Sequence, residues 1–160
     1  MTGHALRTAE EHPDKRLIVH YLQPHNPFVG PFGRELFKQE STSLLDVVAE
    51  SDRSDEQLRE AYRENLSLVL DEVDNLLDGL SGRTMITADH GEMLGDRYDY
   101  VPVKDYGHHP GIFNDPTVKA PMHIHESGSR CRITSERPEQ ASTVDDEELD
   151  DRLRNLGYRV

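Results

Sequence analysis

The sequence is poor in several residue types that mark common protein classes. It has one cysteine and no tryptophan among its 160 residues, and only four of its 18 basic residues are lysines. The single cysteine, Cys131, excludes a disulfide within the chain and any four-cysteine metal site. No apolar run approaches the ~20 residues that a membrane-spanning helix needs. These absences argue against a protein stabilised by internal disulfides and against a membrane-spanning one.

Positive charge is also scarce. Acidic residues number 31 against 18 basic ones, which gives a formal net charge of −13. Such a chain is repelled by phosphate backbones, so we expect neither nucleic acid nor a membrane surface as a partner. An acidic, lysine-poor composition is typical of proteins that stay dissolved in concentrated salt. We therefore expect a halophilic source, an archaeon.

The first ten residues lack the basic start and apolar core of a signal peptide. We therefore expect a cytoplasmic protein, unless a segment upstream of this sequence carries an export signal.

One apolar run ends abruptly in polar residues. Residues 84–88 have the composition of a short buried strand, and Asp89-His90-Gly91-Glu92 follow directly. The C-terminal ends of strands in open α/β sheets are where ligands bind. A carboxylate beside an imidazole suits a divalent metal, and glycine lets other groups approach. Taken alone, the same residues also fit a polar turn after a strand.

Two further histidine motifs stand around this one. Ahead of it, the apolar run 17–22 breaks at Pro24-His25-Asn26-Pro27-Phe28. Behind it, Gly107-His108-His109-Pro110-Gly111 precedes a strand expected at 118–125. The order is strand, Pro-His-x-Pro-Phe, long helix, strand, Asp-His-Gly-Glu, Gly-His and strand.

This order resembles the later part of the sulfatase family, within the alkaline phosphatase superfamily, over roughly residues 16–126. The resemblance implies an α/β fold that forms an incomplete part of a three-layer, mostly parallel sheet with packed helices. It predicts a partial catalytic domain over residues 1–134. Residues 135–160 are expected to form a polar tether and a short C-terminal helix.

The resemblance also implies roles for individual residues. Asp89 and His90 would bind the metal, for which calcium is the first expectation and manganese, magnesium or zinc are alternatives. His25 would contact the ester group of an anionic substrate or protonate its leaving group. Apart from the resemblance, Glu92 is interpreted either as a carboxylate that orients His90 or as a cap of the following turn. Because His90 takes a position that is Asn or His in the family, the choice between sulfate and phosphate chemistry stays open.

A further basic residue is expected in the ester pocket. His108 fits this catalytic and substrate-binding role, although the sequence does not separate it securely from His109. Lys104 is a weaker rival for the same substrate contact. His123 and His125 share a strand face as a metal pair would, but a solvated sheet face explains them as well.

The sequence departs from the family at the nucleophile. The motif Cys/Ser-x-Pro-x-Arg is absent, because Cys131 is followed by isoleucine and serine where proline and arginine are required. We therefore expect no hydrolysis by this chain alone. A companion chain carrying the N-terminal half would supply the nucleophile, or the chain is a truncated remnant.

Two alternative functions remain. One is a phosphodiesterase, phosphatase or phosphoethanolamine transferase of the same superfamily, and the other is a non-catalytic binding or assembly module. A sheet without its first half would also expose apolar surface, which predicts association or poor folding at low salt.

The predicted secondary structure centres on one long helix at residues 54–80. Ser54 and Gln57 form a capping-box pattern, and Gly79 stands where the helix should end. Its polar residues are expected to face solvent: Glu56, Arg59, Glu60, Arg63, Glu64 and Asp71. Strands are expected at 16–22, 83–88, 118–125 and 130–134. Residues 34–50 are weakly helical, and 24–33 and 92–118 are expected to be irregular.

Overall fold

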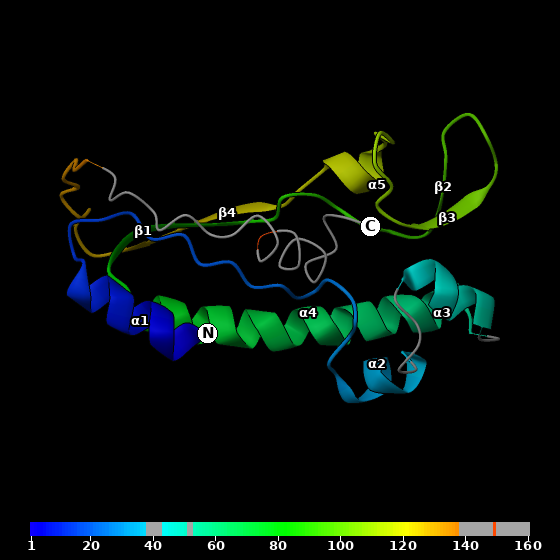
Figure 1. The fold of residues 1–160 in the computed structure, drawn as a ribbon, viewed down its shortest axis with the longest axis horizontal. Helices are drawn as coiled ribbons and strands as arrows, with labels where there is room; N and C mark the ends of the chain where they lie inside the picture. Colours follow the sequence, from blue (N-terminus) through cyan, green and yellow to red (C-terminus); the bar gives the residue numbers. More distant parts are fainter. Residues whose placement is uncertain (38–42, 51–52, 138–148, 150–160) are drawn as a thin grey trace.

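The computed structural model describes residues 1–37, 43–50, 53–137 and 149, which form a mixed α/β structure (Figure 1). Its elements in chain order are α1 Thr2–Glu11, α2 Pro31–Leu36, α3 Leu44–Glu50, α4 Asp55–Asp78, β1 Gly82–Thr87, β2 Met93–Arg97, β3 Lys104–Gly107, α5 Asp115–Val118 and β4 Met122–Ser127. The C-terminal helix expected near residues 147–158 and most of the expected tether lie outside the described residues.

The long helix is confirmed as α4. Its capping box is complete, since the Ser54 side chain accepts from the Gln57 amide and the Gln57 side chain accepts from the Ser54 amide. The helix ends at Gly79, whose amide bonds to carbonyls of the last turn. The expected solvated face is wrong at two positions, because Arg59 and Glu64 are half-buried and bond to other elements.

The strands form two separate two-stranded antiparallel sheets. β1 pairs with β4, with Gly82 opposite Ser127, and β2 pairs with β3, with Met93 opposite Gly107. The mixed α/β class is confirmed, but the described residues contain no three-layer, mostly parallel sheet. The reason lies in the connection after β1. It folds into its own hairpin and α5, and it returns β4 beside β1 in the opposite direction.

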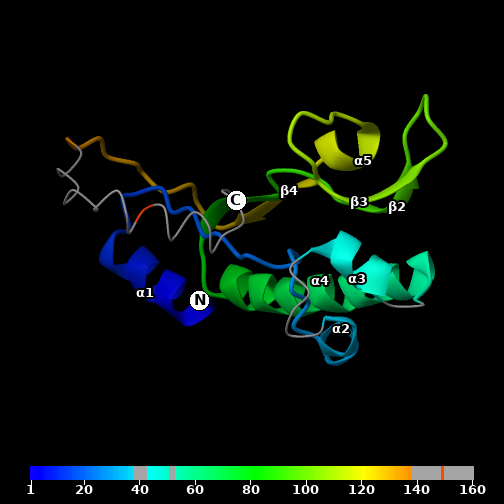
Figure 2. The same cartoon turned by 45° about the vertical axis from the view of Figure 1, so that its right-hand side comes forward.

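The buried strand predicted at residues 16–22 is wrong. This segment has no strand assignment and runs along the length of α4, from α1 towards α2 (Figures 1 and 2). Its Ile18 side chain is 92% exposed. The apolar run reflects a tendency towards burial, but no neighbouring strand pairs with it in the described residues. The strand predicted at 130–134 is also absent, and the one predicted at 118–125 begins only at Met122.

The segments predicted to be irregular hold several short elements. The region 92–118 contains β2, β3 and α5, and α2 already begins at Pro31. The weakly helical region 34–50 corresponds to the end of α2 and to α3.

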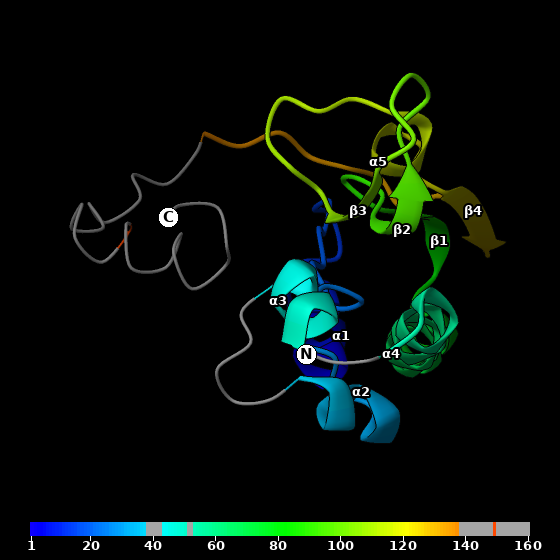
Figure 3. The same cartoon turned by 90° about the vertical axis from the view of Figure 1, so that its right-hand side faces the viewer.

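The hydrophobic core lies around α2, α3 and the first half of α4. Viewed end-on, these helices lie on one side and the strands on the other (Figure 3). The buried core residues are Phe28, Leu36, Leu44, Val47, Leu58 and Ala61. Within the described part of the chain, no helix is long and apolar enough to cross a membrane.

Candidate metal centre

Three side chains of types that can bind a metal meet at the open end of the β2–β3 hairpin. Because Met93 pairs with Gly107, the residues just outside the pair, Glu92 and His108, lie next to each other. His90 joins them from the turn after β1. One potential ligand atom from each of the three side chains lies within 4.8 Å of the other two. The hairpin register thus joins the predicted Asp-His-Gly-Glu and Gly-His motifs.

The third histidine motif also reaches this place. The rings of His90 and His108 have centroids 3.9 Å apart, and the His25 ring lies 5.7 Å from that of His108 in an edge-to-face arrangement. Three histidines from three separate segments therefore form one cluster, which we call the histidine cluster: His25, His90 and His108. The structure brings together these three residues, which the sequence motifs place in separate segments.

Backbone carbonyls orient two of the imidazoles. His90 Nδ1 lies 2.9 Å from the Gly91 carbonyl oxygen, and His25 Nδ1 lies 2.5 Å from that of Asn26. Since a carbonyl only accepts, Nδ1 carries the proton in both rings. Nε2 is therefore the ring atom of each that is left to bind a metal or to exchange a proton.

Glu92 is the carboxylate of the centre. Its side chain is only 7% exposed, and its Oε1 accepts a hydrogen bond from His108 Nδ1 at 3.0 Å. This bond raises the pKa of His108 above its ordinary value, although burial opposes the change. Sequence reasoning gave Glu92 only a supporting role. The sequence alone does not reveal that the strand after Glu92 pairs antiparallel with the strand before His108. This pairing is what brings Glu92 beside His108.

Asp89 lies beside the centre but is more open to solvent. Its side chain is 60% exposed, and Oδ1 lies 3.8 Å from His90 Nε2. Oδ1 also accepts from the His90 amide at 3.1 Å. Burial raises the pKa of the Asp89 carboxyl, but the nearby His90 and the backbone hydrogen bonds outweigh it and lower the pKa. The predicted ligands Asp89 and His90 are thus neighbours, and among the described residues His90, Glu92 and His108 form the group of three possible ligands whose atoms all lie within 4.8 Å of one another.

Only glycine fits without a clash at position 91 of the Asp-His-Gly-Glu motif. A Cβ at Gly91 would lie 2.0 Å from the Pro116 carbonyl oxygen, a backbone atom that cannot rotate away. The Gly91 amide donates to the Thr117 carbonyl at 2.8 Å. The short helix α5 therefore packs directly on the turn that carries His90 and Glu92. Gly107, with φ +96°, takes a left-handed conformation just before His108.

Two buried residues hold the loop that carries His25. Asn65 of α4 is fully buried, and its side-chain amide donates to the Pro24 carbonyl at 3.0 Å and accepts from the Val29 amide at 3.0 Å. Phe28 is 2% exposed and packs edge-on against Phe37. The Pro-His-x-Pro-Phe motif is therefore fixed at both ends, and His25 lies between the two fixed ends.

Two other predicted candidates have different partners. Lys104 lies at the far end of the hairpin, opposite Arg97, and forms an ion pair with Asp55. His109 turns to Asp105, with Nε2 3.1 Å from Oδ1. The structure therefore distinguishes the two adjacent histidines, because only His108 joins the cluster.

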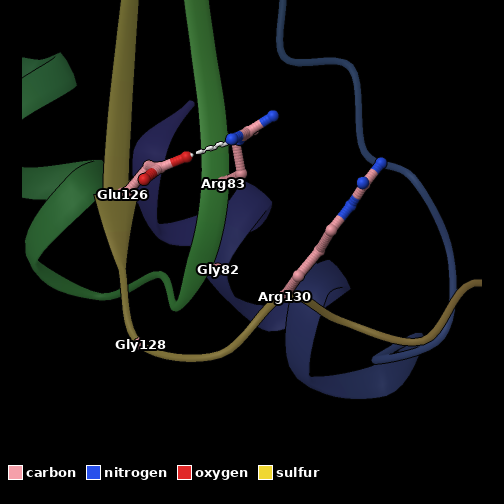
Figure 4. Close-up of a pocket in the computed structure, with 5 residues that line it drawn as sticks. All are labelled: Gly82, Arg83, Glu126, Gly128 and Arg130. Carbon is pink, nitrogen blue, oxygen red and sulfur yellow. Dashed lines mark hydrogen bonds and ion pairs between the residues drawn. The ribbon is translucent and has the colours of Figure 1, made fainter.

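A separate pocket lies at the other end of β1 (Figure 4). It has a volume of about 230 Å³ and is lined by Gly82, Arg83, Glu126, Gly128 and Arg130. Arg83 Nε donates to Glu126 at 2.6 Å, so its charge is already balanced. β1 is six residues long, which separates this pocket from the Asp89 end by roughly 17 Å.

No family model matches the chain, and no curated protein or solved structure matches it either. The resemblance to the sulfatase family therefore stays a prediction from the motifs.

Proposed function

We propose that this chain provides the metal- and ester-binding part of a metal-dependent hydrolase that acts on sulfate esters. The observation that carries the proposal is the convergence of His25, His90 and His108 beside the Glu92 carboxylate. A divalent metal held at the 89–92 turn, where the predicted ligands Asp89 and His90 stand, would stabilise negative charge on the transferred group as a Lewis acid.

The chain's own residues then have separate tasks. The His25 ring presents Nε2, because Nδ1 is held by the Asn26 carbonyl. When protonated, Nε2 donates a hydrogen bond to an ester oxygen or a proton to the leaving group. Asn65 and Phe28 keep this ring at the cluster, and α5 keeps the 89–92 turn in place. The nucleophile is supplied by a companion chain that carries the N-terminal half.

Phosphate diesters are the second candidate substrate class. A centre with several imidazoles suits zinc or manganese better than calcium. Those are the metals that we associate with the phosphate-ester members of the superfamily that the motifs resemble. The two imidazoles of His90 and His108 are the specific observation that supports phosphate diesters as a candidate substrate.

The test is metal-dependent binding of an ester at His25. Histidine ring signals are followed by NMR while 4-nitrophenyl sulfate, and separately bis(4-nitrophenyl) phosphate, is added to the metal-loaded chain. We expect the His25 and His108 signals to shift with the sulfate ester. Both shifts should be absent without metal, and the His108 shift should be reduced in His25→Ala. His4→Ala, which changes an exposed histidine on α1, is the matched control.

The same samples are assayed for 4-nitrophenol release. We expect none from the chain alone. Turnover by the isolated chain would contradict the need for a companion. Ester binding that is equal with and without metal would contradict the proposed function itself.

A further inference from the structure

The donors that meet in the structure differ from the pair that the motif predicted. The predicted pair is Asp89 and His90, and the expected metal is calcium. Calcium takes six to eight oxygen ligands, mostly carboxylates and carbonyls. His90, Glu92 and His108 instead offer two imidazole nitrogens and one carboxylate within 4.8 Å of one another. Two imidazoles are poor ligands for calcium and good ligands for zinc and its neighbours.

We infer that His90, Glu92 and His108 form a three-ligand site for a zinc-class transition-metal ion, and that Asp89 stands outside its ligand set. The inference rests on the proposed function for the purpose of the site and on the side-chain geometry for its ligands. It names the metal class, which favours the phosphate-ester candidate over the sulfate-ester one, adds Glu92 as a ligand, and makes His108 a ligand instead of a substrate-contacting base.

The spacing of the three side chains fits this assignment. Zinc bonds of about 2.0–2.1 Å in a tetrahedral site place neighbouring ligand atoms about 3.4 Å apart. His108 Nδ1 and Glu92 Oε1 are already 3.0 Å apart. All three ligand atoms lie within 4.8 Å of one another, so a closure of at most about 1.4 Å reaches the tetrahedral value. Metal binding would displace the proton that His108 Nδ1 donates to Glu92 Oε1.

Burial and charge favour Glu92 over Asp89 as the carboxylate ligand. The Glu92 side chain is 7% exposed, whereas that of Asp89 is 60% exposed. A carboxylate removed from water needs a cation or strong donors beside it, and an exposed one is already stabilised by solvent. Glu92 therefore gains more from a bound cation. The His90 ring is held by the Gly91 carbonyl at Nδ1, so Nε2 is its ligand atom.

Three protein ligands leave at least one coordination position open. Structural zinc sites are closed by four protein ligands, whereas catalytic sites combine three protein ligands with an open position for water or substrate. The His25 ring, 5.7 Å from that of His108, is the nearest further imidazole. It stays available for a substrate contact. The arrangement is therefore that of a catalytic metal site and not that of a structural metal site.

The test compares zinc and calcium binding to the full chain by isothermal titration calorimetry, with cobalt absorption as a second probe of ligand geometry. We expect one zinc per chain, and no calcium binding at concentrations where zinc saturates. Glu92→Gln and His108→Ala should each weaken zinc binding by more than about 100-fold, beyond what loss of a merely supporting residue causes. Asp89→Asn should cost less than about tenfold. His123→Ala on β4 controls for zinc held by surface histidines.

Two results would overturn the inference. One is preferential binding of calcium, and the other is loss of zinc binding in Asp89→Asn while Glu92→Gln retains it. If a variant fails to fold by circular dichroism, the zinc-against-calcium comparison on the wild-type chain still decides the metal class. Zinc bound as expected with no ester contact at His25 would leave this inference standing and remove the proposed function.

Discussion

Replacing Asn65 by leucine tests how the His25 loop is held. Asn65 is fully buried and makes two hydrogen bonds of 3.0 Å, to the Pro24 carbonyl and from the Val29 amide, and a longer one of 3.4 Å to the His25 carbonyl. Leucine has nearly the same size but no polar atoms. A net hydrogen bond contributes about 1 kcal/mol, and a buried group left without its partner costs about 1–3 kcal/mol. We therefore expect Asn65→Leu to lower the free energy of unfolding by about 2–3 kcal/mol.

Urea unfolding followed by circular dichroism measures this effect. With a slope of about 2 kcal/mol per molar urea, the midpoint should fall by about 1–1.5 M. Asn75→Leu, on the exposed side of the same helix, should change stability by less than about 0.5 kcal/mol. The His25 ring signal should also lose its response to ester binding in Asn65→Leu. A midpoint unchanged from that of Asn75→Leu would refute the assignment of Asn65 as the residue that holds this loop.

The remaining predictions concern other parts of the molecule. Gly91→Ala should displace α5 and weaken zinc binding, because its Cβ would lie 2.0 Å from the Pro116 carbonyl oxygen; unchanged affinity in calorimetry would contradict this. The hydrogen bond from Lys104 lowers the pKa of Asp55. Asp55 therefore stabilises the fold above its unfolded value of about 3.8, and this contribution is lost as pH falls through the lower folded value. Asp55→Asn should thus destabilise at about pH 6 and not at about pH 2, and equal effects at both would be the contrary result. Ile18→Ser should reduce concentration-dependent association at low salt in sedimentation, because Ile18 is 92% exposed; association equal to that of the wild type would argue against the exposed 16–22 segment as its cause.

Local patterns predicted the features that depend on neighbours in sequence. The capping box at Ser54 and Gln57 and the helix end near Gly79 are determined by hydrogen bonds within one or two turns, and both are present. The convergence of His25, His90 and His108 was predicted from the order of three motifs. The physical support for it comes from the hairpin register and from Asn65.

The features that depend on distant partners were predicted poorly. The apolar run 16–22 has strand composition, but strand formation needs a neighbour with free backbone groups, and β1 pairs only with β4 in the described residues. Glu92 was assigned a supporting role because the pairing of Met93 with Gly107 is not visible in the sequence. The partial exposure of Asp89 was equally hidden, since it depends on what packs around the turn.

The most direct test of the account is the metal content of the purified chain, measured by mass spectrometry for the wild type beside His90→Ala. His90 belongs both to the predicted ligand pair and to the three-ligand set that we infer from the structure. The account predicts about one transition-metal ion per wild-type chain, as expected for a three-ligand site, and none in His90→Ala. Equal metal content in the two proteins, or none in either after metal loading, would contradict it.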